Sequence, residues 1–133
     1  MISLQQARSL FARDRFATET TGVHIVEVGD HFARCSLSIR PDHRNAMGAV
    51  MGGVLFTLAD FTFAVAANTD ALEWVSLQSS INFLSSASSS LLSATARCVR
   101  MGRSTAFFEI EIRNESDLLL AVVSTTGMRV PVK

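Results

Sequence analysis

The pattern of apolar and polar positions divides the chain into a helical start, a helical centre and two stretches of strands. Ser3 is suited to cap a first helix, which we expect to end near Phe16, before the polar residues 18–22. One face of that helix carries the apolar residues Leu4, Ala7, Leu10 and Phe11. From Val23 onward the period becomes two, which is typical of strands.

Two strand candidates precede the centre of the chain and four follow it. The first two cover residues 24–28 and 33–39, with a turn at Gly29-Asp30 between them. The later candidates cover residues 74–84, 92–98, 105–113 and 118–130. No linker or internal repeat interrupts them, so we expect one domain over residues 1–133.

The central segment is a helix candidate that is apolar on every face. Residues 54–67 are interrupted only by Thr57, Asp60 and Thr62. A membrane span needs about 20 apolar residues, so this helix is expected inside a protein core. A long apolar helix with hairpin-connected strands predicts the α+β class, with an antiparallel sheet wrapped around one central helix. That arrangement is the hotdog fold.

The amino-acid composition limits the cellular environment and the binding partners that we expect for this chain. The formal net charge is zero and the pI is about 6.8, which favours neither nucleic acid nor an anionic membrane surface. Hydrophobic residues make up 48% of the chain, so we expect apolar surface to meet a second copy. Cys35 and Cys98 are expected to be buried, reduced thiols of a cytoplasmic protein, with a disulfide between them as the alternative. The start lacks the charged head and apolar run of a signal peptide.

Several common chemistries find no support in the spacing of the residues. His24, His31 and His43 are scattered and neither cysteine belongs to a C-x-x-C pair, so we expect no metal. No serine lies in a G-x-S-x-G elbow, and the glycines lack dinucleotide-binding spacing.

Asp60 and the Gly52-Gly53 pair remain as candidates. A desolvated carboxylate has a raised pKa and suits a general base; alternatively, Asp60 is a structural carboxylate bonded to a neighbouring hydroxyl. The glycines would leave backbone N–H groups free at a helix N-terminus, where an oxyanion can bind. Alternatively, they only permit close packing of the loop.

At this point the sequence resembles a known family. Residues 43–60 resemble the signature N-x-x-G-x-x-H-G-G-x-x-x-x-L-x-D of hotdog acyl-CoA thioesterases of the phenylacetate-degradation type. The matching positions are Asn45, Gly48, Gly52, Gly53, Leu58 and Asp60. Val75-Ser76, residues 81–87 and the M-G-R-S turn at 101–104 extend the resemblance, which spans about residues 22–128.

The resemblance implies a role for each matching position. Asp60 would activate the attacking water or attack directly, and Ser76 would help to hold the water. Asn45 and the N–H of Gly52 would bind the thioester carbonyl oxygen. The turn at Gly102 and Arg103 would lie near the phosphates of coenzyme A, which is part of the substrate, and no other cofactor is implied. Homotetramers built as dimers of dimers are also implied.

Other residues are expected to line the substrate site. Gly53 and Met51 adjoin the carbonyl-binding end of the helix. Several apolar residues could line an acyl pocket or serve as core: Phe56, Phe61, Phe63, Phe83 and the first helix. Aromatic and medium-chain acyl groups both remain open.

Met51 is the main departure from the signature, because the family has histidine there. A thioether cannot donate a hydrogen bond, so we expect slow but measurable hydrolysis. The alternative is an acyl-CoA-binding protein that has lost efficient catalysis. A hotdog dehydratase is disfavoured, since its histidine-bearing loop is absent. His43 is expected to be a surface histidine or, less simply, a substitute imidazole.

The spacing along the helix predicts a shared site. Gly52 and Asp60 are eight positions apart, or about 12 Å at 1.5 Å per residue. That separation is too large for both to act on one carbonyl. If both act, Asp60 of one chain must meet Gly52 of another, giving a two-fold homodimer with two shared sites.

Overall fold

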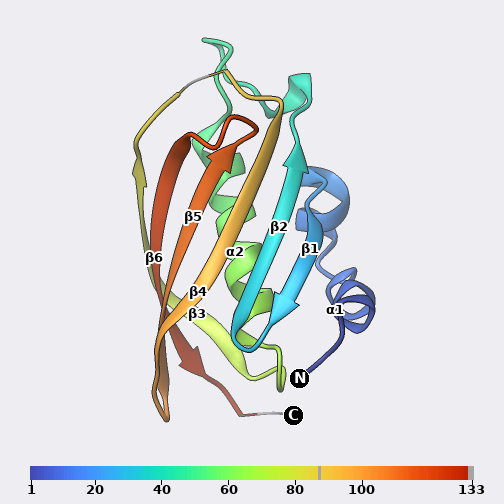
Figure 1. Cartoon of the computed structure of the whole chain (residues 1–133), viewed down its shortest axis with the longest axis vertical. Helices are drawn as coiled ribbons and strands as arrows, with labels where there is room; N and C mark the ends of the chain where they lie inside the picture. The colour runs from blue at the N-terminus through green and yellow to red at the C-terminus, as the bar shows by residue number, and fades with distance from the viewer. Residues whose placement is uncertain (87, 132–133) are drawn as a thin grey trace.

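A computed structural model describes residues 1–86 and 88–131 (Figure 1). The helical elements are α1 (Leu4–Phe11), the π-helix η1 (Phe16–Thr21), the 3-10 helix η2 (Pro41–His43) and α2 (Gly52–Ala67). The strands are β1 (His24–Gly29), β2 (Phe32–Ser38), β3 (Trp74–Phe83), β4 (Leu91–Met101), β5 (Thr105–Asn114) and β6 (Leu119–Arg129).

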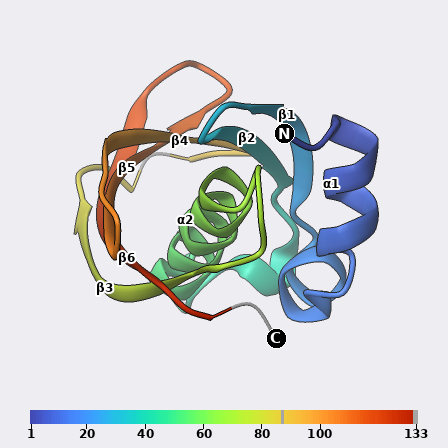
Figure 2. The same cartoon turned by 90° about the horizontal axis from the view of Figure 1, so that it is seen from below.

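The strands form one six-stranded antiparallel sheet in the order β1-β2-β4-β5-β6-β3. Seen end-on, the sheet curls around α2, with β3 returning beneath the helix and α1 beside β1 (Figure 2). The α+β hotdog fold expected from the sequence is therefore confirmed. β1 and β3 are the two edges, and each has only one strand neighbour.

Helix α2 supplies the centre of the core. Leu58, Phe63 and Val65 are fully buried, and the ring of Phe63 meets Phe108 of β5 edge to face at 5.3 Å. Burying a side chain of this size stabilises the fold by about 1.5–3 kcal/mol. On β5 the inward residues Phe108, Ile110 and Ile112 alternate with exposed ones, as the period of two predicted.

The sheet does not cover α2 on every side, contrary to the expectation from its apolar sequence. One stripe stays partly open to solvent, and we call it the open stripe: Gly53, Phe56, Thr57, Asp60 and Ala64. These positions recur every three or four residues, so they share one face of the helix. Within residues 1–86 and 88–131, this face is covered only in part.

The first helix is shorter than predicted. It begins at the Ser3 cap, where Ser3 and Gln6 form a capping box, but it ends at Phe11 rather than near Phe16. The polar stretch that follows belongs to η1, which Gly22 ends in a left-handed conformation at φ 94°. Within the described residues, no helix is both long enough and apolar enough to cross a membrane.

The two cysteines differ. Cys35 is fully buried, as expected, whereas Cys98 is half-buried, and both thiols are free, so the disulfide alternative is wrong. Burial raises the pKa of the Cys35 thiol to about 12, with a smaller opposing effect from its hydrogen bond with Thr62.

Candidate active site

The N-terminus of α2 presents free backbone donors. Met51 is the N-cap residue and its side chain makes no capping hydrogen bond. The N–H groups of Gly52 and Gly53 precede the first intrahelical bonds, and neither has an acceptor among the described residues. The positive end of a 16-residue helix therefore points two unsatisfied donors outward.

Asn45 belongs to the loop that leads into this helix end. Its Oδ1 accepts hydrogen bonds from the N–H groups of Met47 and Ala49, both at 3.0 Å. Its backbone N–H donates to the carbonyl of Ala49 at 2.8 Å. The Oδ1 atom thus fixes the loop, while the exposed Nδ2 donates no hydrogen bond to any residue that the structure describes.

Asn45 and Gly52 line the same cleft, which has a volume of about 510 Å³ and is here called the donor cleft. Phe83 forms another part of its wall. A Cβ atom on Gly52 would lie 3.0 Å from Cζ of Phe83, so the absence of a side chain lets this ring approach the helix end. A Cβ on Gly53 would meet nothing within 4 Å.

Asp60 lies two turns further along α2, on the open stripe, in a second cleft of about 450 Å³ that we call the Asp60 cleft. Its carboxylate has neither a hydrogen bond nor an ion pair among the described residues. The hydroxyls of Thr57 and Thr62 instead donate to backbone carbonyls of their own helix. The alternative of a carboxylate held by a neighbouring hydroxyl is therefore not found.

The electrostatics of the Asp60 cleft favour the protonated acid. Burial raises the pKa of Asp60 above its usual value, and the nearby charge of Asp14 raises it further. A carboxylate with a raised pKa is a stronger proton acceptor once it is ionised. The cleft therefore holds a group with the properties of a general base.

The two clefts share no lining residue. The structure brings Asn45, Gly52 and Phe83 together in one and Asp60 with Phe56 in the other. The separation agrees with the distance of about 12 Å expected along one helix. Neither cleft alone contains both the donors and the base.

Three other predicted positions lie outside both clefts. Ser76 is exposed on the edge strand β3, where the pairing with β6 is irregular between Ser76 and Gln78. Gly102 and Arg103 form the β4–β5 turn, and Arg103 borders a hollow with Glu73, just beyond the C-terminus of α2. That is the opposite end of a helix about 24 Å long.

The acyl-pocket candidates separate in the same way. Phe56 and Phe61 line the Asp60 cleft, Phe83 lines the donor cleft, and Phe63 is core. The first helix was also a candidate, but α1 ends at Phe11 and does not line the Asp60 cleft. The residues that follow α1 line it instead, namely Asp14, Arg15, Phe16 and Ala17. An aromatic residue inside a polar stretch, at Phe16, was the available signal.

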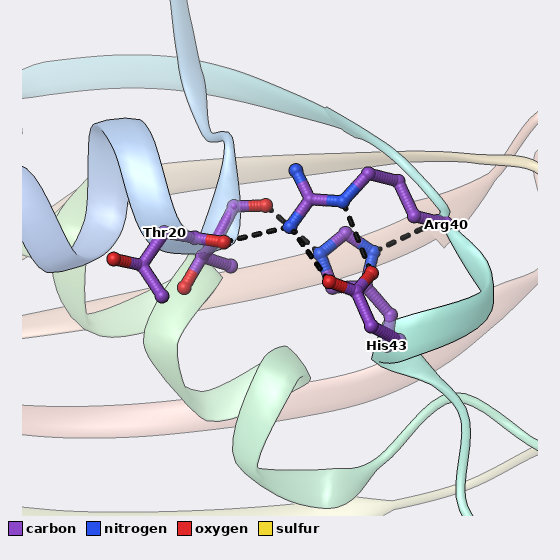
Figure 3. Close-up of polar contacts among 5 residues, drawn as sticks. Thr20, Arg40 and His43 are labelled. Carbon is purple, nitrogen blue, oxygen red and sulfur yellow. Dashed lines mark hydrogen bonds and ion pairs between the residues drawn. The ribbon is translucent and has the colours of Figure 1, made fainter.

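His43 is neither a surface histidine nor a substitute imidazole, so both expectations are wrong. The side chain is buried, with 3% of the residue exposed. Its Nδ1 accepts a hydrogen bond from the N–H of Arg40, and Nε2 donates to the carbonyl of Thr21, each at 2.9 Å (Figure 3). The Arg40 guanidinium also donates to the carbonyl of Thr20 at 2.7 Å. This network fastens η1 to the loop that leads to Asn45.

One cluster has the residue types of a metal site. Within the described residues, His31 Nε2 lies 3.8 Å from Oδ1 of its neighbour Asp30, and folding brings it to 3.7 Å from Oδ2 of Asp70, which is distant in sequence. A metal on Nε2 would leave the proton on Nδ1, which is buried and has no hydrogen-bond partner among the described residues. The histidine therefore lacks the outer hydrogen bond that usually orients a metal ligand, which disfavours metal binding at this cluster.

Comparisons with known proteins agree with this architecture. The profile of the thioesterase superfamily matches residues 47–121, more than half of the chain. A putative esterase of Archaeoglobus fulgidus is 30% identical over 113 residues, covering 84% of this chain and 73% of that protein. The acyl-coenzyme A thioesterase PaaI of Escherichia coli is 29% identical over 127 residues, covering 95% and 90%.

Comparison with solved structures also identifies a thioesterase. The structure of the E. coli PaaI protein from the phenylacetic acid degradation operon superposes with a TM-score of 0.85 at 27% identity, covering 97% of each chain. Fold, sequence profile and relatives thus converge on one family. The chain belongs to the thioesterase superfamily.

Proposed function

We propose that this protein hydrolyses acyl-CoA thioesters at a site completed by two copies of the chain. The observation that carries the proposal is the unpaired, half-buried Asp60 on the open stripe, in a cleft separate from the free donors at Gly52. A base and an oxyanion site are the two groups that thioester hydrolysis requires. The activity named for the E. coli relative supports the choice of acyl-CoA.

The proposed reaction uses groups from both chains. Asp60 of one copy takes a proton from water, whose oxygen attacks the thioester carbonyl carbon. The N–H of Gly52 and Nδ2 of Asn45 from the second copy stabilise the resulting oxyanion. The carbon–sulfur bond then breaks, and the CoA sulfur takes the proton from Asp60. In the alternative mechanism, the Asp60 carboxylate itself attacks the thioester carbonyl carbon and displaces CoA, and water then hydrolyses the resulting anhydride.

The surface of the chain supports a second copy at this position. The edge strand β3 is exposed along most of its length, including Leu77, which is 56% exposed. Unpaired edge strands of this length invite pairing with another strand. Gly53, which has no reason within the chain to lack a side chain, lies on the open stripe, where a substrate or partner would approach. Ser76, on the same edge strand, keeps its proposed role of holding water.

Further parts of the proposal concern substrate and assembly. The Arg103 turn would meet CoA phosphates, and the exposed N-cap Met51 would border the carbonyl. Dimers of this kind would associate into tetramers in the cytoplasm. A second candidate function is acyl-CoA binding with little hydrolysis, which the absence of a side-chain hydrogen bond from Met51 favours.

A thiol-release assay tests the proposal. Purified protein is mixed with a panel of aromatic and medium-chain acyl-CoAs, and free CoA is followed with a thiol-reactive dye. We expect release that the Asp60→Asn variant loses. Tight acyl-CoA binding without release would favour the binding protein, and neither binding nor release would contradict both functions.

A further inference from the structure

The Asp60 cleft has two walls of different origin. One wall is α2 itself, and the other consists of residues 14–17, at the end of the α1–η1 connection and the start of η1, which we call the N-terminal wall. The superfamily profile matches residues 47–121 and so does not include the N-terminal wall. The residues opposite the proposed base are therefore not part of the segment that the superfamily profile matches.

The apolar part of the cleft is built from facing aromatic residues. Phe16 is 66% exposed and Phe56 is 36% exposed, although both line the cleft. Phe61 is fixed behind them, because its ring meets Phe11 of α1 edge to face at 6.0 Å. Exposing a phenyl ring to water is unfavourable, so an apolar group entering the cleft would bury Phe16 at a gain in free energy.

The charge of the cleft is negative. Asp14 has no side-chain hydrogen bond or ion pair among the residues described, and its charge acts on Asp60. Arg15, the one cation of the N-terminal wall, pairs with Glu19 at 2.6 Å, and both of these side chains are exposed. Helix α2 carries no charged residue besides Asp60. Among the described residues that line the cleft, the only cation is therefore already paired, and none is free to compensate a second negative charge.

We propose that the N-terminal wall selects the acyl group, with Phe16 binding its apolar end and Asp14 rejecting acyl groups that carry a distal carboxylate. This inference rests on the proposed function, since it concerns the substrate of the same site. Discrimination against a charged competitor by a like charge in the pocket is an established route to specificity. The substrate class is thus an uncharged, apolar acyl-CoA.

The test compares two six-carbon substrates that differ in one carboxylate, hexanoyl-CoA and adipoyl-CoA. We expect the wild type to prefer hexanoyl-CoA. Asp14→Asn should raise kcat/KM for adipoyl-CoA by about tenfold relative to hexanoyl-CoA, within the range of pocket discrimination. Because Asp14 also acts on Asp60, the ratio of the two substrates is the readout, and any common change in rate cancels. Asp117→Asn is the matched control, at an exposed carboxylate in the β5–β6 turn.

A second variant tests the apolar part. Phe16→Ala should raise KM for hexanoyl-CoA by about tenfold with kcat little changed, and Phe16→Leu should restore most of the loss. An unchanged substrate ratio in Asp14→Asn, or an unchanged KM in Phe16→Ala, would overturn the assignment even though the enzyme hydrolyses acyl-CoA. If the wild type releases CoA from neither substrate nor from the wider panel, the proposed function itself fails.

Discussion

The two clefts along α2 offer opposite chemistry. The donor cleft at the start of the helix presents the free N–H of Gly52 and the amide of Asn45, and it contains no ionisable group. The Asp60 cleft presents an unpaired carboxylate whose pKa is raised by burial. One region can stabilise negative charge, and the other can accept a proton.

The comparison gives the physical reason for our proposal that two copies of the chain complete each site. Both regions belong to the same rigid element, so no movement within the chain brings Asp60 to Gly52. Each region also has a feature that the chain alone leaves unexplained, a carboxylate without a partner in one and a Gly53 surrounded by open space at the edge of the other. A two-fold dimer would account for both features, because each chain would place its Asp60 opposite the Gly52-Gly53 end of the other.

Removing the base should have the largest effect. Asp60→Asn keeps the size of the side chain but cannot accept the proton, so we expect kcat to fall by about 100-fold or more. Steady-state CoA release by the folded variant measures it. Near-wild-type turnover would remove Asp60 from the mechanism and leave the Asp60 cleft as a binding surface.

A substitution at Gly53 tests whether a substrate or partner approaches the N-terminal end of α2. In Gly53→Ala the new methyl meets no atom of the chain, and alanine is better by up to about 1 kcal/mol in a helix, so the melting temperature should not fall. We nevertheless expect kcat/KM to drop by more than about tenfold, because the methyl occupies the approach to the oxyanion site. Full activity in a stable Gly53→Ala protein would show that nothing approaches this face closely.

Met51 tests how complete the donor cleft is. Met51→His restores the signature residue and should raise kcat/KM by roughly tenfold, or about 1.4 kcal/mol. Met51→Gln serves as a control, since it adds a polar side chain without an imidazole. If the histidine variant folds normally and is no faster, Met51 is not a defect of the site.

The smallest predicted effect is on stability. The pKa of Asp60 is raised in the folded protein, so ionisation destabilises the fold once the pH exceeds the ordinary carboxylate pKa. Asp60→Asn should therefore melt at a temperature a few degrees higher than wild type at pH 7, and the difference should shrink as the pH falls toward the ordinary carboxylate pKa. Thermal melts between pH 4 and pH 8 measure it. A variant less stable at pH 7 would indicate that the carboxylate has a structural partner.

Much of the fold follows from local patterns. The alternation of Phe108, Ile110 and Ile112 gave the buried face of β5, and the apolar run from 54 to 67 gave α2. The separation of Gly52 from Asp60 followed from the rise of a helix. These features depend on residues that are close in sequence, where periodicity carries the information.

The features that the sequence did not reveal all depend on distant contacts. His43 is buried because it bonds to Thr21, 22 residues earlier. The N-terminal wall reaches α2 only through the packing of η1, and a polar stretch around Phe16 has no periodic pattern to indicate it. The open stripe likewise depends on where the sheet stops curling, which is a property of the whole sheet.

The central claim is that each site is made by two chains, and mixing inactive variants tests it most directly. Asp60→Asn removes the base, and Asn45→Asp keeps the Oδ1 bonds of the loop while removing the Nδ2 donor. Equal amounts are unfolded together and reassembled, and mass spectrometry verifies the exchange. Half of the dimers are then mixed, and each has one intact site, so about one quarter of wild-type activity should return.

The same exchange with wild type and the double variant, Asn45→Asp with Asp60→Asn, provides the control. If the sites are shared, mixed dimers are inactive, and the mixture keeps about one quarter of the activity of an all-wild-type sample. If each site lies within one chain, the mixture keeps about one half of that activity. Recovery in the first mixture and the lower value in the second are the results that we predict. A first mixture as inactive as its parents, with one half retained in the second, would contradict the account.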